Sequence, residues 1–227
     1  QVLVEGQLCP TVRLDGELWA DIGPIAPLGL RNIEIVEKAE KPRAASQLIA
    51  RKEGRKDVLD NGLIRVVVDV ESGSISSFFD LRSGREWVDA ETREGFGSYR
   101  YDIFGRDEIT AYLRDYAYDL EPWFVEDFGK PEYPKIVHHT YLSSLENISI
   151  TNGVDWGALE VVWSQEPESM DIYGNARRII QKLTLPREQP WLDITYHLDD
   201  KSATQFLESG HIVFPLAAQD PHYAINK

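Results

Sequence analysis

Short apolar stretches that alternate with polar residues dominate the chain and predict β-strands. Residues 63–70 form a β-branched run between the turn signals Asn61-Gly62 and Ser72-Gly73, and residues 74–81 lead to a further turn at Ser83-Gly84. Because glycine supplies the positive φ of tight turns, this succession predicts an antiparallel meander. Further strands are expected over residues 135–142, 146–151, 159–164, 177–185, 192–198 and 211–216.

One segment has helical periodicity. Ile109, Tyr112, Leu113 and Tyr116 are spaced by three, four and seven residues, which places them on one face of a helix. The sequence therefore predicts an all-β fold with one short helix near residues 107–117, and Asp107 is expected as its N-cap.

The chain divides into three stretches by composition. Residues 1–36 alternate apolar runs with Gly and Pro and predict a small β-element of two or three strands around a Pro-rich bend. Residues 37–56 are rich in charge and Ala, so we expect a linker, with a short helix over 44–50 as the alternative. Residues 57–227 are expected to form one β-sandwich domain, either whole or incomplete at its C-terminal end. The start at Gln1, without a signal region, predicts a piece of a longer protein.

The net charge and the cysteine content of the chain limit the classes of partner and the compartment that we expect. Asp and Glu number 38 against 24 Lys and Arg, a net charge of −14, so the surface repels phosphate backbones and argues against nucleic acid as a partner. The apolar runs fall short of the roughly 20 residues of a membrane span, so no membrane is expected as a partner. A single cysteine, Cys9, excludes an internal disulfide and fits a reducing compartment, from which we expect a cytoplasmic protein.

Acidic pairs and histidines are weak candidates for catalysis. Glycosidases need two carboxylates at a defined separation, but with 38 acidic residues in 227 some pairs arise by chance, and a solvated face is the default interpretation. Adjacent His138 and His139 would point to opposite faces of a strand and cannot share a metal ion. The acidic pairs are Asp199-Asp200, Glu126-Asp127 and Asp80 beside Arg82, and the isolated histidines are His197, His211 and His222.

The strongest candidate for ligand binding follows Gly97. Tyr99, Arg100, Tyr101 and Asp102 combine rings with charged hydrogen-bonding groups, as carbohydrate-binding sites do. The alternative is a strand with the two tyrosines on one face and Arg100 and Asp102 on the other. The sequence leaves both open.

Three segments together resemble the large β-domain of glycoside hydrolase family 38 α-mannosidases. Residues 60–86 are similar to the opening of that domain, and residues 20–29 look like the family's "V-x-x-I-P-P-L-G" segment. Residues 191–201, followed by Glu208 and Phe214-Pro215, are similar to its "D-I-x-[WY]-x-[IL]-x-D-K … E … F-P" run. The segments occur in the family's order.

The resemblance implies an antiparallel β-supersandwich of the galactose-mutarotase-like kind. It also implies that zinc and the catalytic carboxylates belong to a separate catalytic domain, so no cofactor is expected in this chain. Gly97-Ser98-Tyr99 matches the family's "G-A-Y" tyrosine, which reaches the active site. Arg100, Tyr101 and Asp102 depart from the apolar run that follows it in the family.

Three functions are expected in decreasing order. The first is the non-catalytic sandwich of an α-mannosidase-like hydrolase, with the catalytic domain of the same polypeptide and carbohydrate as partners. The second is a free-standing carbohydrate-binding module. The third is a mutarotase-like epimerase with His139 as acid and Glu160 as base. An open sheet edge further predicts self-association, unless the tail at Asp220-Pro221-His222 blunts that edge.

Overall fold

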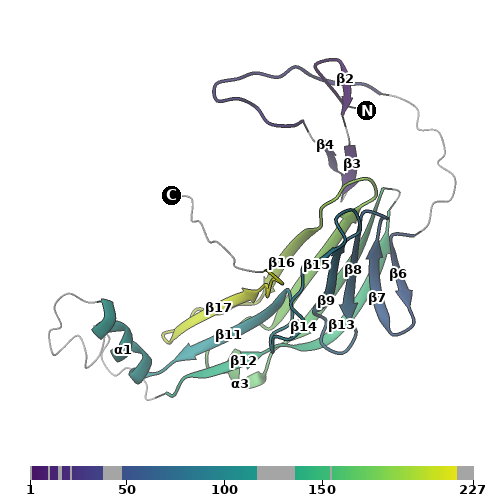
Figure 1. Cartoon of the computed structure of the whole chain (residues 1–227). Helices are drawn as coiled ribbons and strands as arrows, with labels where there is room; N and C mark the ends of the chain where they lie inside the picture. Colours follow the sequence, from purple (N-terminus) through teal and green to yellow (C-terminus); the bar gives the residue numbers. More distant parts are fainter. Residues whose placement is uncertain are drawn as a thin grey trace.

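The computed structural model describes residues 2–9, 11–14, 17–20, 22–37, 48–116, 136–153 and 155–218. Strands dominate these residues and all strand pairs are antiparallel, which confirms the predicted all-β sandwich. Figure 1 shows two facing layers, an extension that ends near helix α1, and a small N-terminal element above them.

Three sheets build the main body. The first has the order β10-β9-β8-β7-β6, the second β13-β14-β15-β16 and the third β12-β11-β17. Their strands are β6 (Ala50–Glu53), β7 (Lys56–Asp60), β8 (Ile64–Asp69), β9 (Ile75–Asp80), β10 (Arg85–Glu86), β11 (Ser98–Phe104), β12 (His139–Leu142), β13 (Ser144–Asn152), β14 (Trp156–Ser164), β15 (Arg178–Pro186), β16 (Asp193–Asp199) and β17 (Leu207–Val213).

Backbone hydrogen bonds join the first and third sheets into one layer. The Ile75 N–H donates to the Phe96 carbonyl at 2.9 Å, next to the start of β11. Beyond β17, the Asp89 N–H donates to the Pro215 carbonyl at 3.0 Å. The four-stranded sheet is the opposite layer, so β11 belongs to a broad sheet that covers the core on one side.

The core fills the space between the layers. Tyr101 from the broad layer and Trp163 and Leu183 from the opposite layer are among its fully buried side chains. Burial of such side chains removes apolar surface from water and gives about 25 cal/mol per Å2. Alternation along the strands is what directs every second residue into this space.

Side-chain amides and an indole tie the layers together at their borders. The Asn152 amide donates to the Ala50 carbonyl at 2.8 Å and accepts from the Ala50 N–H at 2.9 Å, so it pairs with β6 as a neighbouring strand would. Asn61 donates to the carbonyls of Pro186 and Gln189 at 2.6 and 2.8 Å. The Trp163 indole N–H donates to the Ser72 carbonyl at 2.8 Å.

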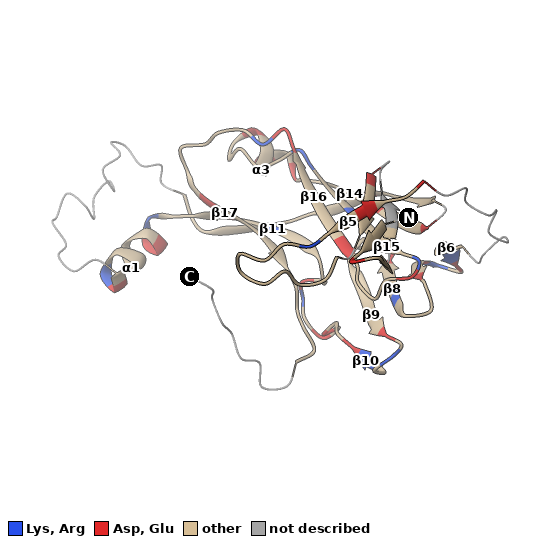
Figure 2. Cartoon of the chain, turned by 90° about the horizontal axis from the view of Figure 1, so that it is seen from above, with Lys and Arg blue, Asp and Glu red and all other residues tan. Residues whose placement is uncertain are grey.

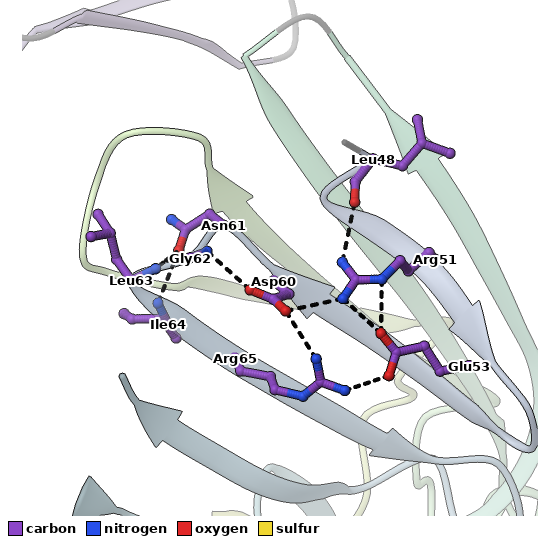
Figure 3. A network of polar contacts seen from close by, with 9 residues as sticks. All are labelled: Leu48, Arg51, Glu53, Asp60, Asn61, Gly62, Leu63, Ile64 and Arg65. Atoms are coloured by element: carbon purple, nitrogen blue, oxygen red, sulfur yellow. Dashed lines mark hydrogen bonds and ion pairs between the residues drawn. The ribbon is translucent and has the colours of Figure 1, made fainter. Parts of the chain in front are cut away.

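An ion-pair network covers the outer face of the first sheet (Figure 3). Arg51 and Arg65 each contact both Glu53 and Asp60, and the Arg65–Asp60 distance is 2.9 Å. These side chains stand on the same face as Val58, which is fully buried although it points away from the core. Because both guanidinium groups are engaged by carboxylates, we assign this network a structural role.

Helix α1 (Arg106–Tyr116) confirms the predicted short helix, but the prediction of Asp107 as its N-cap is wrong. The residue before the helix is Gly105, and its N–H donates to the Glu108 carboxylate at 2.9 Å, half of a capping box. Asp107 instead lies in the first turn. Only Ile109 and Leu113 of the expected stripe are buried. Tyr112 and Tyr116 are exposed and stack at 4.9 Å.

The remaining elements include several that the sequence did not predict. Strand β6 lies inside the stretch 37–56 for which a linker was expected, and the alternative helix over 44–50 falls mostly outside the described residues. The N-terminal element has five short strands rather than two or three, around a small core of Val2, Val4 and Cys9. These strands are β1 (Val2–Val4), β2 (Gln7–Cys9), β3 (Thr11–Leu14), β4 (Glu17–Ala20) and β5 (Ile33–Ile35), and the second helix is α3 (Pro167–Asp171).

Charged residues are spread over the ribbon without a continuous basic stretch in Figure 2. Within the part of the chain that the structure describes, neither helix has the length and apolar character needed to cross a membrane.

Two Ser-Gly turns offer a matched test of packing beneath the meander. Gly73 and Gly84 both have positive φ, but only at Gly73 would a Cβ lie 2.8 Å from the side chains of Val161 and Trp163. We expect Gly84→Ala to lower the free energy of unfolding by about 1 kcal/mol, the cost of a left-handed backbone. Gly73→Ala should cost about 1–3 kcal/mol more through overpacking. Urea unfolding of both variants measures the difference, and equal losses would contradict the packing at Gly73.

Candidate functional site

Strand β11 divides the predicted binding residues between its two faces. Tyr99 and Tyr101 point into the core and are 3% and 0% exposed, whereas Arg100 and Asp102 point to the outer face. Of the two alternatives that the sequence left open, the structure has the strand with segregated faces. The rings and the charged groups therefore cannot contact one ligand together.

Asp102 is the centre of a polar cluster on the outer face. Its carboxylate is only 2% exposed and accepts hydrogen bonds from the Thr140 hydroxyl at 2.6 Å and the Arg100 Nε at 2.8 Å. The Nε2 atoms of His138 and His211 lie 3.2 and 3.6 Å from its two oxygens. We call these five residues the Asp102 cluster.

Strand register explains why these residues meet. Thr140 of β12 and Ser209 of β17 both lie opposite Asp102, and His211 lies opposite Arg100. Residues directly opposite in an antiparallel pair share a face, so three neighbouring strands contribute to one patch. His138 precedes β12, and its ring stacks on Phe104 at 5.2 Å.

The partners of Asp102 decide its protonation state. Burial raises the pKa of this carboxyl, but hydrogen bonds from Thr140, His138 and Arg100 outweigh burial and hold the pKa below the ordinary 3.8. Asp102 is therefore ionised at neutral pH. It orients the guanidinium and imidazole groups, which are themselves partly exposed.

The cluster is suited to binding through donors rather than to nucleophilic catalysis. Ser209 Oγ lies 2.7 Å from His211 Nε2, but the same nitrogen faces Asp102. A Ser-His-Asp triad needs the two partners on different ring nitrogens, so this arrangement is not a triad. Guanidinium, imidazole and hydroxyl groups held by a buried carboxylate instead offer hydrogen bonds to hydroxyls or anionic groups of a ligand.

On the inner face of β11, the hydroxyl groups of the two tyrosines are hydrogen-bonded to nearby residues. Tyr101 lies between the Glu208 carboxylate and the Tyr173 carbonyl, the latter at 2.8 Å, and Lys201 Nζ contacts both Glu208 oxygens at 2.8 Å. Tyr99 donates to Asn175 at 3.2 Å. Burial, aided by the charge of Glu208, raises the pKa of Tyr99 to about 12. These tyrosines serve the core and present no exposed ring face.

The other catalytic candidates are not brought together. Asp199 pairs with Arg178 at 3.3 Å and Asp200 with Arg177 at 3.0 Å, while Asp80 pairs locally with Arg82. Each carboxylate is thus paired with an arginine, and Asp199 and Asp200 stand at the surface. Glu126, Asp127 and His222 lie outside the described residues.

The residues of the epimerase hypothesis lie in different sheets. His139 is on β12, where its ring contacts Tyr141 at 4.4 Å. Glu160 is on β14, exposed, and alternates with the core residues Leu159 and Val161, so it faces away from the core. The histidine pair points to opposite faces as expected, since His138 contacts Asp102 and His139 contacts Tyr141.

No group of three or more His, Cys, Asp or Glu residues that could hold a metal ion occurs in the described part of the chain. In the Asp102 cluster, the carboxylate is instead hydrogen-bonded to the His138 imidazole, and the His211 imidazole lies 3.6 Å from it.

Sequence reasoning missed most partners of Asp102. Thr140 and Ser209 carry no motif, and His211 was an isolated histidine. Their only signal is the strand pairing, because each lies opposite Asp102 or Arg100 in the register.

Comparison with protein families identifies the family of this chain. The profile of a family described as "Domain of unknown function (DUF5054)" matches residues 36–193, which include Arg100, Asp102, His138 and Thr140. None of the curated proteins with which the chain was compared matches it.

The ionised Asp102 predicts an acid-dependent stability. Because its pKa is lower in the folded chain than the ordinary 3.8, the stabilisation is present above that pH and is lost as the pH falls through the folded pKa. We expect Asp102→Asn to lower the free energy of unfolding at neutral pH by about 1–3 kcal/mol, the value of hydrogen bonds to a charged group. The difference from the wild type should shrink below pH 3.8. Urea unfolding across the acid range measures it, and the exposed Asp193→Asn variant is the control. A constant difference at all pH values would contradict the ionised state.

Tyr99 in the core and the partly buried Tyr196 predict a loss of stability at high pH. Burial raises the pKa of Tyr99 and Tyr196 to about 12, above the ordinary 10.0, so their stabilisation is present below pH 10.0 and is lost as the pH rises through 12. Tyrosinate absorbance and circular dichroism should therefore change together in this range. Tyr99→Phe should remove one group from the cooperative step. Ionisation of Tyr99 without unfolding would contradict its burial.

Proposed function

The chain belongs to the DUF5054 family, and we propose that this member is the non-catalytic β-sandwich portion of an α-mannosidase-like glycoside hydrolase, with the outer face of β11 lining one side of the sugar pocket. The observation that carries the proposal is the Asp102 cluster. Its donors converge from three strands on one exposed patch, and a buried carboxylate fixes their orientation.

Hydrogen-bond chemistry supports sugar as the ligand. Sugar hydroxyls accept from guanidinium, imidazole and hydroxyl groups, and donors held in place lose little entropy on binding. Arg100 and Asp102 remain the proposed binding residues, and His138, Thr140 and His211 join them. Tyr99 and Tyr101 support this face from behind, because they anchor the same strand in the core.

The resemblance to family 38 hydrolases supports the class of parent. It rests on residues 20–29, 60–86 and 191–201, and the last two of these segments carry the β8–β9 meander and β16. Under this proposal zinc and the catalytic carboxylates belong to the catalytic domain, and that domain and carbohydrate are the partners. A cytoplasmic location follows from the single cysteine.

The proposal predicts weak sugar binding without turnover. The chain should not hydrolyse an aryl α-mannoside, since the proposal assigns the catalytic carboxylates to a separate domain. In an NMR titration with methyl α-mannoside, the amide resonances of Arg100, His138 and Thr140 should shift, with a dissociation constant in the millimolar range or about −4 kcal/mol.

Two matched variants test whether the Asp102 cluster is the binding site. Asp102→Asn should weaken binding about tenfold, which corresponds to about 1.4 kcal/mol, whereas exposed Asp193→Asn should leave it unchanged. Turnover of the aryl mannoside by this chain, or shifts confined to residues far from β11, would overturn the proposal.

A free-standing carbohydrate-binding module is the second candidate, since the Asp102 cluster is exposed in the chain itself. The two candidates differ in the affinity for carbohydrate that they predict. Micromolar binding to one glycan on an array, lost in Asp102→Asn, would favour the module over the hydrolase portion. The epimerase has no corresponding observation, because His139 and Glu160 lie in different sheets.

A further inference from the structure

Among the described residues, β17 has a neighbouring strand on one side only, and the backbone groups on its outer edge face no other strand. The carbonyls of Val213 and Pro215 accept from Gly97 and Asp89 at 2.7 and 3.0 Å, so these odd-numbered residues face the interior of the broad sheet. Because successive residues of a strand direct their N–H and C=O groups to opposite sides, Gly210, Ile212 and Phe214 face outward. Within the described residues, the backbone groups of these three residues have no strand beside them. In Figure 1, β17 forms the border of its sheet, with β11 and β12 on one side.

The same residues leave apolar side chains uncovered. Ile212 lies opposite the buried Tyr99, which places its side chain on the core face, yet it is 37% exposed. Phe214 contacts the core residue Phe96 at 5.1 Å and is 42% exposed, and Leu216 is 52% exposed. The inward face of the sandwich is therefore closed along β11 but open along β17.

This edge lacks the protection that sheet borders normally have. Lysines, inward charges and prolines on the free side are the usual devices against edge-to-edge pairing. Residues 207–217 contain one charged side chain, Glu208, and Lys201 of the same chain neutralises it. Pro215 faces the interior side, where its carbonyl accepts from Asp89, so its missing N–H does not interrupt the outer row.

We propose that β17 pairs with β17 of a second copy of this chain, antiparallel and across a two-fold axis at Ile212. In this register Ile212 exchanges two hydrogen bonds with the same residue of the second copy, and Gly210 lies opposite Phe214. Pro215 lies opposite Ser209 at a non-hydrogen-bonded position, where a missing N–H costs nothing. The strand is thus compatible with itself at each of these positions.

Charge favours this edge as the contact. Two copies with a net charge of −14 each repel one another, so they associate best where the surface is locally neutral. The strip along β17 meets this condition because Glu208 and Lys201 compensate each other. Added salt screens the long-range repulsion and should therefore strengthen the pair.

The test is the mass of the chain in solution. Light scattering over a concentration series should show a monomer–dimer equilibrium that shifts toward dimer with added salt. Ile212→Lys places two like charges opposite each other at the axis and should give a monomer at every concentration. Asn147→Lys adds the same charge at an exposed position on β13, the edge strand of the opposite sheet, and should leave the equilibrium unchanged.

Hydrogen exchange of the wild type is a second test, which does not depend on correct folding of a variant. In the wild type, the amides of Gly210, Ile212 and Phe214 should gain protection as concentration rises, while those of β13 should not change. A monomer at all concentrations would overturn the proposal. So would a dimer that survives Ile212→Lys, or a wild-type chain that stays monomeric but binds a peptide with the sequence of residues 207–217, which would assign the edge to another partner.

Discussion

Strand alternation in β11 is the constraint from which the site and one wall of the core follow. Each residue of an extended strand must point opposite to its neighbours. β11 forms part of the wall of the core, so Tyr99 and Tyr101 must enter the core and Arg100 and Asp102 must leave it. A buried carboxylate on the outer face then needs donors to offset its desolvation, and the flanking strands supply them.

The two borders of the sandwich are built differently. Beside β6, the Asn152 amide takes the place of another strand and closes the gap between the layers. On the opposite side, the Tyr196 hydroxyl donates to the Gly97 carbonyl at 2.8 Å at the start of β11, and Lys201, which follows β16, pairs with Glu208 of β17 at 2.8 Å. Between these two ties the apolar side chain of Ile212 stays partly exposed. Single side chains therefore close both borders, but the border along β17 leaves apolar surface open.

The sequence predicted the parts of the fold that local chemistry decides. The β-branched run and the Ser-Gly turns placed β8 and β9 within a residue or so, and the spacing of Ile109 and Leu113 found α1. It did not predict β6, since a charged four-residue strand has no apolar alternation, nor the N-cap, since Gly105 relies on Glu108. The Asp102 cluster was half predicted. Arg100 and Asp102 lie close in sequence, but their partners arrive through pairing across tens of residues, which no local pattern records.

The asparagine side chains that join the two layers also link the fold to the chemical lifetime of the chain. Asn61 and Asn152 are each followed by glycine, the neighbour that leaves the next peptide nitrogen most free to attack a side-chain amide and release ammonia. That reaction would turn the donor facing the Ala50 carbonyl into a carboxylate that repels it, and it would do the same to the donor facing Pro186. While the layers are joined, both amides are held in hydrogen bonds; once they part, both are exposed to ageing. Damage at either position would in turn hinder the layers from rejoining, so slow chemistry at two asparagines makes transient opening progressively irreversible.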